Sequence, residues 1–236
     1  MDELLHSKFW TDIGWEDPCE EVDDGFAYID GHKFECVHTV DSGKFHNVFV
    51  LDSSGSMSGQ PWQNLLYACK DFGINRLKDG GENDLVSYIT FDDQSQIHCE
   101  AASLSEAVQM EIPYSGGGTC FEEGLCAASE ILSRNNFEEF KAVLVFFSDG
   151  RPRDPKLGLT LARYIRSTYA KYDLKAYVVG FGYVNLPVLE RMAAEMGGEY
   201  RQVLDANELV TEFQQIAAVL CSSEASLALL DSADVS

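Results

Sequence analysis

Three short polar segments carry the side chains of this sequence that are best suited to hold a metal ion. They are the Asp-Ser-Ser-Gly-Ser run at 52–56, the Gly-Gly-Gly-Thr run at 116–119 and the Ser-Asp-Gly run at 148–150. Their hydroxyl and carboxylate oxygens suit a hard divalent ion such as Mg²⁺, which needs few protein ligands because it keeps several waters. None of the three segments contains His or Cys, and this composition argues against zinc. The sequence therefore predicts a site for a hard divalent cation.

Alternating strand-like and helix-like patterns surround these segments from about residue 45 to residue 220. Apolar runs typical of buried strands lie at 47–51, 85–91, 95–101, 142–147, 176–181 and 200–203. This alternation predicts an α/β fold with a doubly wound, mainly parallel central sheet and helices on both faces. In such folds ligands bind at the carboxyl ends of the strands, where the polar runs at 52–56 and 148–150 begin.

Four stripes of apolar residues have the three-to-four-residue spacing of a buried helix face. They are Trp62, Leu65, Leu66, Cys69, Phe72 and Leu77; Phe121, Leu125, Ala128 and Leu132; Leu157, Leu161, Ile165 and Thr168; and Phe213, Ile216, Ala217 and Leu220. We expect these stripes to face the core of the domain rather than a partner protein.

Residues 1–44 differ in character from the rest, since they are acidic and lack the alternating pattern. Within them, the apolar runs 26–29 and 34–37 flank Asp30-Gly31, and Asp-Gly between two such runs is a strong signal for a β-hairpin. We expect an N-terminal extension at 1–44, whose hairpin extends the sheet or covers its edge, and an α/β domain at 45–221. The Ser-, Ala- and Asp-rich residues 222–236 are expected to form a flexible tail.

Charge limits the kinds of partner that this chain can bind. Its 236 residues include 17 Lys and Arg against 39 Asp and Glu, which gives a net charge of -22. Such a charge repels the phosphate backbone of nucleic acids, so we expect no nucleic-acid partner. A hydrophobic content of 45% is sufficient for a core of ordinary size.

The sequence also gives indications of cellular location. Its first residues lack the basic and apolar stretches of a secretory signal, and no run approaches membrane-spanning length. Four of the seven cysteines, Cys69, Cys99, Cys120 and Cys126, lie inside predicted helices and strands rather than in a framework of loops. We expect a cytoplasmic protein without membrane insertion, although an excised extracellular domain would lack a signal in the same way.

Taken together and in this order, the three polar segments resemble the von Willebrand factor type A (VWA) domain with its metal-ion-dependent adhesion site (MIDAS). The resemblance rests on Asp-x-Ser-x-Ser after the first strand, Gly-Gly-Thr before a helix, and a strand that ends in Asp-Gly. It covers about residues 45–220 and implies a Rossmann-like fold.

The resemblance also implies roles for individual side chains. Ser54 and Ser56 would bind the metal directly, and Thr119 would bind it directly or through water. Asp52 and Asp149 would act through water and orient the ligands around the ion. The implied ion is Mg²⁺, with Mn²⁺ and Ca²⁺ as alternatives, and an open coordination position would accept an Asp or Glu of a partner protein. We therefore expect a cation-dependent protein-binding module of the adhesion or adaptor type.

Enzyme motifs are poorly matched by the same segments. A nucleophile elbow at 55–59 would place Met57 at the nucleophile position, and a phosphate-binding loop would need Lys where Thr119 and Cys120 follow the glycines. An aspartyl phosphotransferase would need a second carboxylate at Ser54. We expect no enzymatic activity. The alternative function is a regulatory or scaffolding module of a larger intracellular complex that contains a kinase, a chelatase or ubiquitin-related proteins.

Other polar residues leave alternatives open. Zinc-capable side chains occur near the N-terminus at Cys19, His32, Cys36 and His38. Their spacing matches no common zinc finger, so buried cysteines and solvent-facing histidines are the favoured interpretation. Asp92 and Asp93 lie either at the rim of the metal site or in a solvated turn. Arg151 and Arg153 either flank the site and attract an acidic partner or are ordinary surface charges.

Overall fold

The computed structural model describes residues 26–29, 32–35, 44–182 and 187–225, and the chain divides into two units, Met1–Asp41 and Ser42–Ser236. In the first unit, β1 (Phe26–Ile29) pairs antiparallel with β2 (His32–Glu35). This pairing confirms the predicted hairpin, although β2 begins two residues before the predicted run 34–37. That this hairpin covers or extends the larger sheet stays a prediction. Cys19, Cys36 and His38 lie outside the described residues, so the zinc-capable group that includes them stays untested.

Six strands form the central sheet of the second unit, in the order β5-β4-β3-β6-β7-β8. Their bounds are β3 (Lys44–Asp52), β4 (Leu85–Phe91), β5 (Ser95–Ser103), β6 (Phe140–Ser148), β7 (Lys175–Phe181) and β8 (Glu199–Val203). Neighbouring strands are parallel except that β5 runs antiparallel to β4. The predicted mainly parallel sheet is confirmed, and each predicted strand lies within an observed one.

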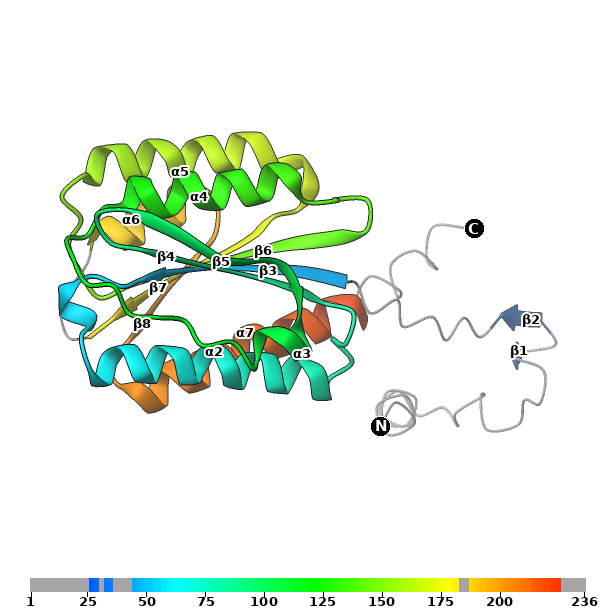
Figure 1. Ribbon diagram of the computed structural model, residues 1–236. Helices are drawn as coiled ribbons and strands as arrows, with labels where there is room; N and C mark the ends of the chain where they lie inside the picture. Colours follow the sequence, from blue (N-terminus) through cyan, green and yellow to red (C-terminus); the bar gives the residue numbers. More distant parts are fainter. Residues whose placement is uncertain (1–25, 30–31, 36–43, 183–186, 226–236) are drawn as a thin grey trace. The chain divides into compact units, whose positions relative to one another are not determined.

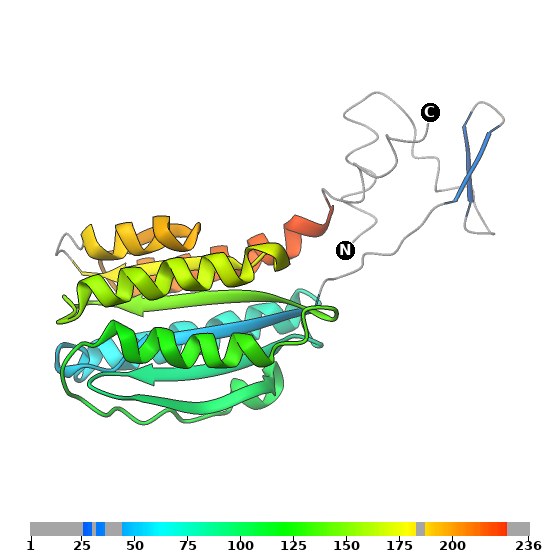
Figure 2. The same cartoon turned by 90° about the horizontal axis from the view of Figure 1, so that it is seen from above.

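Helices cover both faces of the sheet, as predicted (Figure 1). One face packs against α2 (Gln60–Lys78), α3 (Leu104–Ala107) and α7 (Ala206–Ala225), and the other against α4 (Phe121–Arg134), α5 (Pro155–Tyr169) and α6 (Pro187–Met196). Figure 2 shows α4, α5 and α6 side by side across their face. Two 3₁₀ turns, η1 (Gly55–Met57) and η2 (Ala170–Tyr172), complete the described elements. Among the described residues, no helix combines the length and apolar character needed to cross a membrane.

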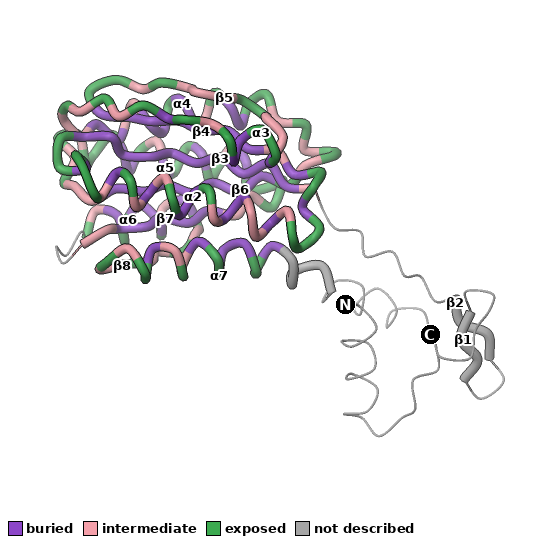
Figure 3. Tube along the Cα trace, turned by 60° about the horizontal axis from the view of Figure 1, so that its bottom comes forward, coloured by how far each residue is buried: buried purple, intermediate pink, exposed green. Residues whose placement is uncertain are grey.

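The central strands are buried on both sides, which is the usual state of parallel strands covered by helices (Figure 3). Along β3, Val48 and Val50 pack toward the face covered by α4, α5 and α6, whereas Phe49 and Leu51 pack toward α2 and α7. Because successive side chains of a strand point to opposite faces, one apolar strand supplies both halves of the core.

The predicted buried stripes on α4 and α7 are confirmed. The stripe on α2 is buried except for Leu66 and Leu77, which are half-buried. The predicted buried face of α5 is wrong by part of a helical turn. On α5 the buried residues are Gly158, Leu159, Ala162, Ile165 and Tyr169, and Leu157 is 40% exposed. A methyl group at Gly158 would lie 3.0 Å from Cβ of Phe121. Small residues therefore form much of the contact with α4, and a stripe defined by large apolar residues misses them.

The direction of winding reverses at β3. The chain passes from β3 through α2 to β4 on one side, whereas β6, β7 and β8 follow one another on the other side. The chain that leaves β3 enters α2 on one face of the sheet, whereas the chain that leaves β6 enters α5 on the other. The carboxyl ends of these two strands are therefore the reversal point, which is where α/β sheets bind ligands.

At the opposite ends of the strands, a buried ion pair joins three elements. Arg76, near the end of α2, donates from Nε to Asp84 Oδ2 at 2.9 Å, and its Nη2 lies 2.8 Å from the same oxygen. The other oxygen, Oδ1, accepts the backbone N–H of Phe45 at 3.0 Å. Both side chains are at most 3% exposed.

Replacing Asp84 tests this connection between α2, β3 and β4. We expect Asp84→Asn to lower the free energy of unfolding by about 3–5 kcal/mol, because the buried guanidinium of Arg76 loses its charge partner. Glu139→Gln breaks the exposed pair between Glu139 and Lys44 and should change stability by no more than about 1 kcal/mol. Urea denaturation measures both, and equal effects of the two substitutions would show that the pair at Asp84 has no special role.

Candidate metal centre

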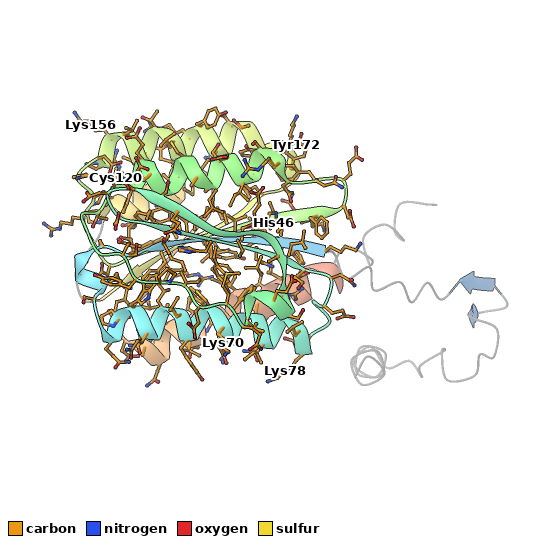
Figure 4. All side chains as sticks on the ribbon, viewed as in Figure 1. His46, Lys70, Lys78, Cys120, Lys156 and Tyr172 are labelled. Carbon is orange, nitrogen blue, oxygen red and sulfur yellow. The ribbon has the colours of Figure 1, made fainter. Side chains whose placement is uncertain are left out.

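The three polar segments meet at the carboxyl ends of β3 and β6. The 52–56 segment leaves β3 and enters η1, the 148–150 segment leaves β6, and the 116–119 segment leads into α4. Figure 4 labels Cys120, the residue after Thr119, at the end of the molecule where Figure 1 shows the turn after β3. The residues that the sequence predicts for the site therefore lie at the reversal point of the sheet.

Asp52 is the fully buried member of this group, and each of its oxygens has a partner. Oδ1 accepts the backbone N–H of Ser54 at 2.9 Å, and Oδ2 accepts the hydroxyl of Ser148. Ser148 lies next to Asp52 because Leu51 and Phe147 pair in the register of β3 with β6. Burial raises the pKa of Asp52 to about 6, and the hydrogen bonds from Ser148 and Ser54 act in the opposite direction.

Ser54, Ser56 and Asp149 continue this group toward solvent. The Ser56 hydroxyl donates to Asp149 Oδ1 at 2.8 Å, and Ser54 Oγ lies 3.2 Å from Ser56 Oγ. Either hydroxyl could be the donor in the second contact. Burial raises the pKa of Asp149, and the Ser56 hydrogen bond opposes that rise. Ser54 is buried and Ser56 is exposed, so the cluster reaches from the core to the surface.

Thr119 borders the same space from the third loop. A methyl group added at Gly150 would lie 3.2 Å from Thr119 Oγ1 and 3.8 Å from Asp52 Oδ2. The hydroxyl of Thr119 and the carboxylate of Asp52 are thus both next to Gly150. The structure brings together all five predicted residues, Asp52, Ser54, Ser56, Thr119 and Asp149. Their binding to a metal stays a prediction.

Backbone hydrogen bonds fasten the glycine-rich loop to the loop after β3. Gly55 N–H donates to Gly117 O and Gly116 N–H donates to Ser53 O, each at 2.9 Å. Gly117 has a φ of 150° and an added Cβ would lie 3.0 Å from Cγ of Asp92, so both conformation and space require glycine there. These hydrogen bonds join the two loops along one border of the site.

Sequence reasoning assigned no role to two residues that shape this border. Ser148 donates to Asp52 and also accepts the backbone N–H of Gly150 at 3.1 Å. Its place beside Asp149, at the end of a predicted strand, is the available signal. Tyr114 donates from its hydroxyl to the carbonyl of Ser54 at 2.9 Å, and no local pattern in the sequence indicates this contact.

The donor set fits a hard divalent cation. It consists of three hydroxyls and two carboxylates, without nitrogen or sulfur, and the buried carboxylate of Asp52 would be stabilised in its ionised form by a nearby positive charge. A second group with metal-capable atoms, Cys120, Glu122 and Asp154, lies at the start of α4. There the Asp154 oxygens accept the N–H groups of Phe121 and Glu122, so this carboxylate serves as a helix cap.

Comparison with known proteins identifies the family. The sequence profile of the von Willebrand factor type A domain matches residues 48–216, which is well over half of the chain. The chain belongs to the von Willebrand factor type A domain family. The resemblance of the three polar segments and the observed fold agree with this membership.

Two curated relatives show that this VWA domain is similar to parts of longer proteins. Inter-alpha-trypsin inhibitor heavy chain 4 of Mus musculus is 30% identical over 200 residues, covering 75% of this chain and 20% of the mouse protein. An uncharacterised protein of Synechocystis is 31% identical over 180 residues, covering 71% of this chain and 39% of that protein. The chain thus spans about a fifth of the mouse relative's length.

Solved structures confirm the fold. Proximal thread matrix protein 1 from the mussel byssus, with a zinc-occupied MIDAS motif, has a TM-score of 0.60 at 20% identity, covering 76% of this chain and 46% of the mussel chain. The pilus adhesin SpaC of Lactobacillus rhamnosus GG has a TM-score of 0.62 at 14% identity, covering 76% of this chain and 30% of the adhesin. At these identities the likeness extends to the fold alone.

Ser148→Ala tests how Asp52 is held. Removing the hydroxyl deprives a buried carboxylate of a hydrogen bond and should lower the free energy of unfolding by about 1.5–3 kcal/mol. The matched control is Ser133→Ala, on the exposed end of α4, which should stay within about 0.5 kcal/mol of the parent. Chemical denaturation in chelator compares the two variants, and a neutral Ser148→Ala would contradict the role given to this serine.

Proposed function

We propose that this VWA domain binds a divalent cation through its MIDAS residues and uses it to bind a partner protein that presents an Asp or Glu. The MIDAS residues are Asp52, Ser54, Ser56, Thr119 and Asp149. The observation that carries the proposal is the convergence of these oxygen-bearing side chains, from three separate loops, at the reversal point of the sheet. VWA relatives that include pilus adhesins support an adhesive or adaptor role.

In this proposal the neutral and the charged residues of the site have different roles. The neutral hydroxyls of Ser54, Ser56 and Thr119 hold the cation, while Asp52 and Asp149 orient those hydroxyls and the bound water. Asp52 is fitted to an orienting role because its oxygens are already engaged by Ser54 N–H and Ser148. When bound, the cation supplies a positive charge that neutral ligands do not cancel and that attracts a carboxylate.

We propose Mg²⁺ as the ion, because the donors are all oxygens and hard ions prefer them. Mn²⁺ and Ca²⁺ have the same preference and remain alternatives. The zinc-occupied MIDAS of the mussel protein adds zinc to the candidates, even though the three segments of this chain contain no His or Cys. A comparison of the four ions therefore belongs in any binding experiment.

The negative net charge of the chain should make binding of an acidic partner fully dependent on the cation. A chain with a net charge of -22 repels an acidic ligand unless a local positive charge intervenes. Binding of a carboxylate should therefore be lost, and not merely weakened, when the cation is removed.

A second candidate function is a regulatory or scaffolding role within a larger assembly. It is favoured by the mouse relative, in which the region similar to this chain forms 20% of a longer protein. In either role we propose that the domain binds other proteins and catalyses no reaction itself.

We also propose a reducing compartment such as the cytoplasm. The described cysteines Cys69, Cys99, Cys120 and Cys126 are free thiols, and Cys69 and Cys120 are buried. Burial raises the pKa of the Cys69 thiol far above its usual range, which keeps it unreactive. Denaturation with a thiol reagent on protein from the native source would count reduced cysteines, and blocked thiols would point to an oxidising compartment.

Thermal stability in the presence of metal ions tests the cation site. At 100 times the dissociation constant, a ligand of the folded state adds about 2.7 kcal/mol, which corresponds to a rise in Tm of about 5–10 °C for a domain of this size. Ser56→Ala should remove most of this rise. Ser58→Ala, an exposed serine in the same loop, should keep it. An equal response of both variants would mean that the cation binds elsewhere.

Cation-dependent capture tests the partner hypothesis. Immobilised domain should recover partner proteins from the native source in Mg²⁺ and release them in chelator, because the carboxylate contact needs the ion. Ser56→Ala should recover none of them, and Ser58→Ala should recover all. Partners that stay bound in chelator, or that Ser56→Ala also recovers, would contradict metal-bridged binding.

A further inference from the structure

An exposed ion pair beside the MIDAS residues joins two of the loops around the site. Asp93 lies in the turn between β4 and β5, and Arg153 follows β6. Arg153 Nη1 is 2.6 Å from Asp93 Oδ1, with the side chains 59% and 47% exposed. Exposed ion pairs of this kind contribute little to the free energy of unfolding. We therefore look for the role of this pair in the positions of the loops that it joins.

The same aspartate also holds the glycine-rich loop. Asp93 Oδ2 accepts the backbone N–H of Gly118, the residue before Thr119, at 3.0 Å. The carboxylate occupies the space above this glycine, because a methyl group there would lie 2.5 Å from Asp93 Oδ1 and 3.5 Å from Arg153 Nη1. One carboxylate therefore links the Gly118 peptide to the guanidinium of Arg153.

Backbone contacts hold Thr119 from its other side. The N–H of Arg153 donates to the carbonyl of Thr119 at 3.0 Å, and the N–H of Cys120 donates to the carbonyl of Asp92 at 2.9 Å. The peptide group that follows Thr119 is thus attached to Arg153 and Asp92, and the N–H of the preceding residue, Gly118, is attached to Asp93. The pair between Asp93 and Arg153 closes this ring of contacts.

We propose that Asp93 and Arg153 form a clamp that positions the Thr119 hydroxyl for cation binding. The inference rests on the proposed function, since it requires a cation that Thr119 helps to bind. Both are positioning residues, which act on the ion through the backbone of residues 118–119 and not by touching it. This role differs from the sequence alternatives of a solvated turn for Asp93 and of partner attraction for Arg153.

The direction in which Arg153→Ala changes the affinity for the cation distinguishes a clamp from a purely electrostatic effect. Arg153→Ala removes a positive charge near the site. If electrostatic repulsion between Arg153 and the cation were the only effect, the variant would bind the cation more tightly than the parent. Loss of the clamp instead frees the carboxylate that holds Gly118, and Thr119 becomes less well placed. A clamp therefore predicts weaker cation binding by Arg153→Ala.

The test measures the affinity for Mn²⁺ by electron paramagnetic resonance of the free ion, on the full chain. We expect Arg153→Ala to weaken binding about threefold and Asp93→Ala about tenfold, since residues that orient metal ligands commonly contribute 10–100-fold. Arg153→Lys, which keeps a charged partner for Asp93, should bind as the parent does. The matched control is Arg163→Ala, which breaks the exposed pair with Glu195 between α5 and α6 and should leave the affinity unchanged.

A double substitution shows whether the effect passes through Thr119. In the Thr119→Val background, Arg153→Ala should no longer weaken Mn²⁺ binding, because no hydroxyl remains to be positioned. The clamp is wrong if Arg153→Ala binds Mn²⁺ as tightly as the parent or more tightly, or if its effect is the same with and without Thr119. If the parent itself binds no Mn²⁺, the proposed function is wrong and the clamp with it, and this outcome is distinct from failure of the clamp alone.

Discussion

The carboxylate of Asp52 lies at the end of the central strand with no exposed surface, and the site around it depends on how this buried charge is held. A buried carboxylate is costly unless hydrogen-bond donors or a positive charge surround it. Ser54 N–H and the Ser148 hydroxyl supply the donors. These hydrogen bonds join the loop after β3 to the end of β6, and so place Ser54 and Ser56 beside Asp149 at the reversal point of the sheet.

The fold supplies this arrangement through its apolar core. Strands β3 and β6 are buried on both faces, so their ends are fixed in position by packing against helices on each side. Polar loops that leave such rigid strands can be placed accurately, whereas the turn between β4 and β5 and the glycine-rich loop need contacts of their own. Backbone hydrogen bonds to Ser53 and Gly55, and the proposed clamp at Asp93, provide them.

Much of this domain is predictable from its sequence, and the exceptions have physical reasons. Strands β3, β4 and β6 follow from apolar runs, and Asp52, Ser54, Ser56 and Asp149 come just after two of these runs, since such runs are local features. Thr119 follows a run of glycines instead, and the metal-binding roles of all five residues are what the resemblance to the VWA domain implies. The predicted buried face of α5 is wrong because the small residues Gly158 and Ala162 are buried there, and a pattern of large apolar residues does not indicate them. Helices α3 and α6 were not identified, and the contacts of Tyr114 and Arg153 join residues distant in sequence, so only the folded chain reveals them.

The central claim, that the five residues bind a divalent cation, is tested most directly by a crystal structure grown with Mn²⁺ and recorded for anomalous scattering. The account predicts a single strong anomalous peak at the reversal point of the sheet, within direct coordination distance of the hydroxyl oxygens of Ser54 and Ser56. A crystal without a peak there, or with the peak at Cys120, Glu122 and Asp154 instead, would contradict it.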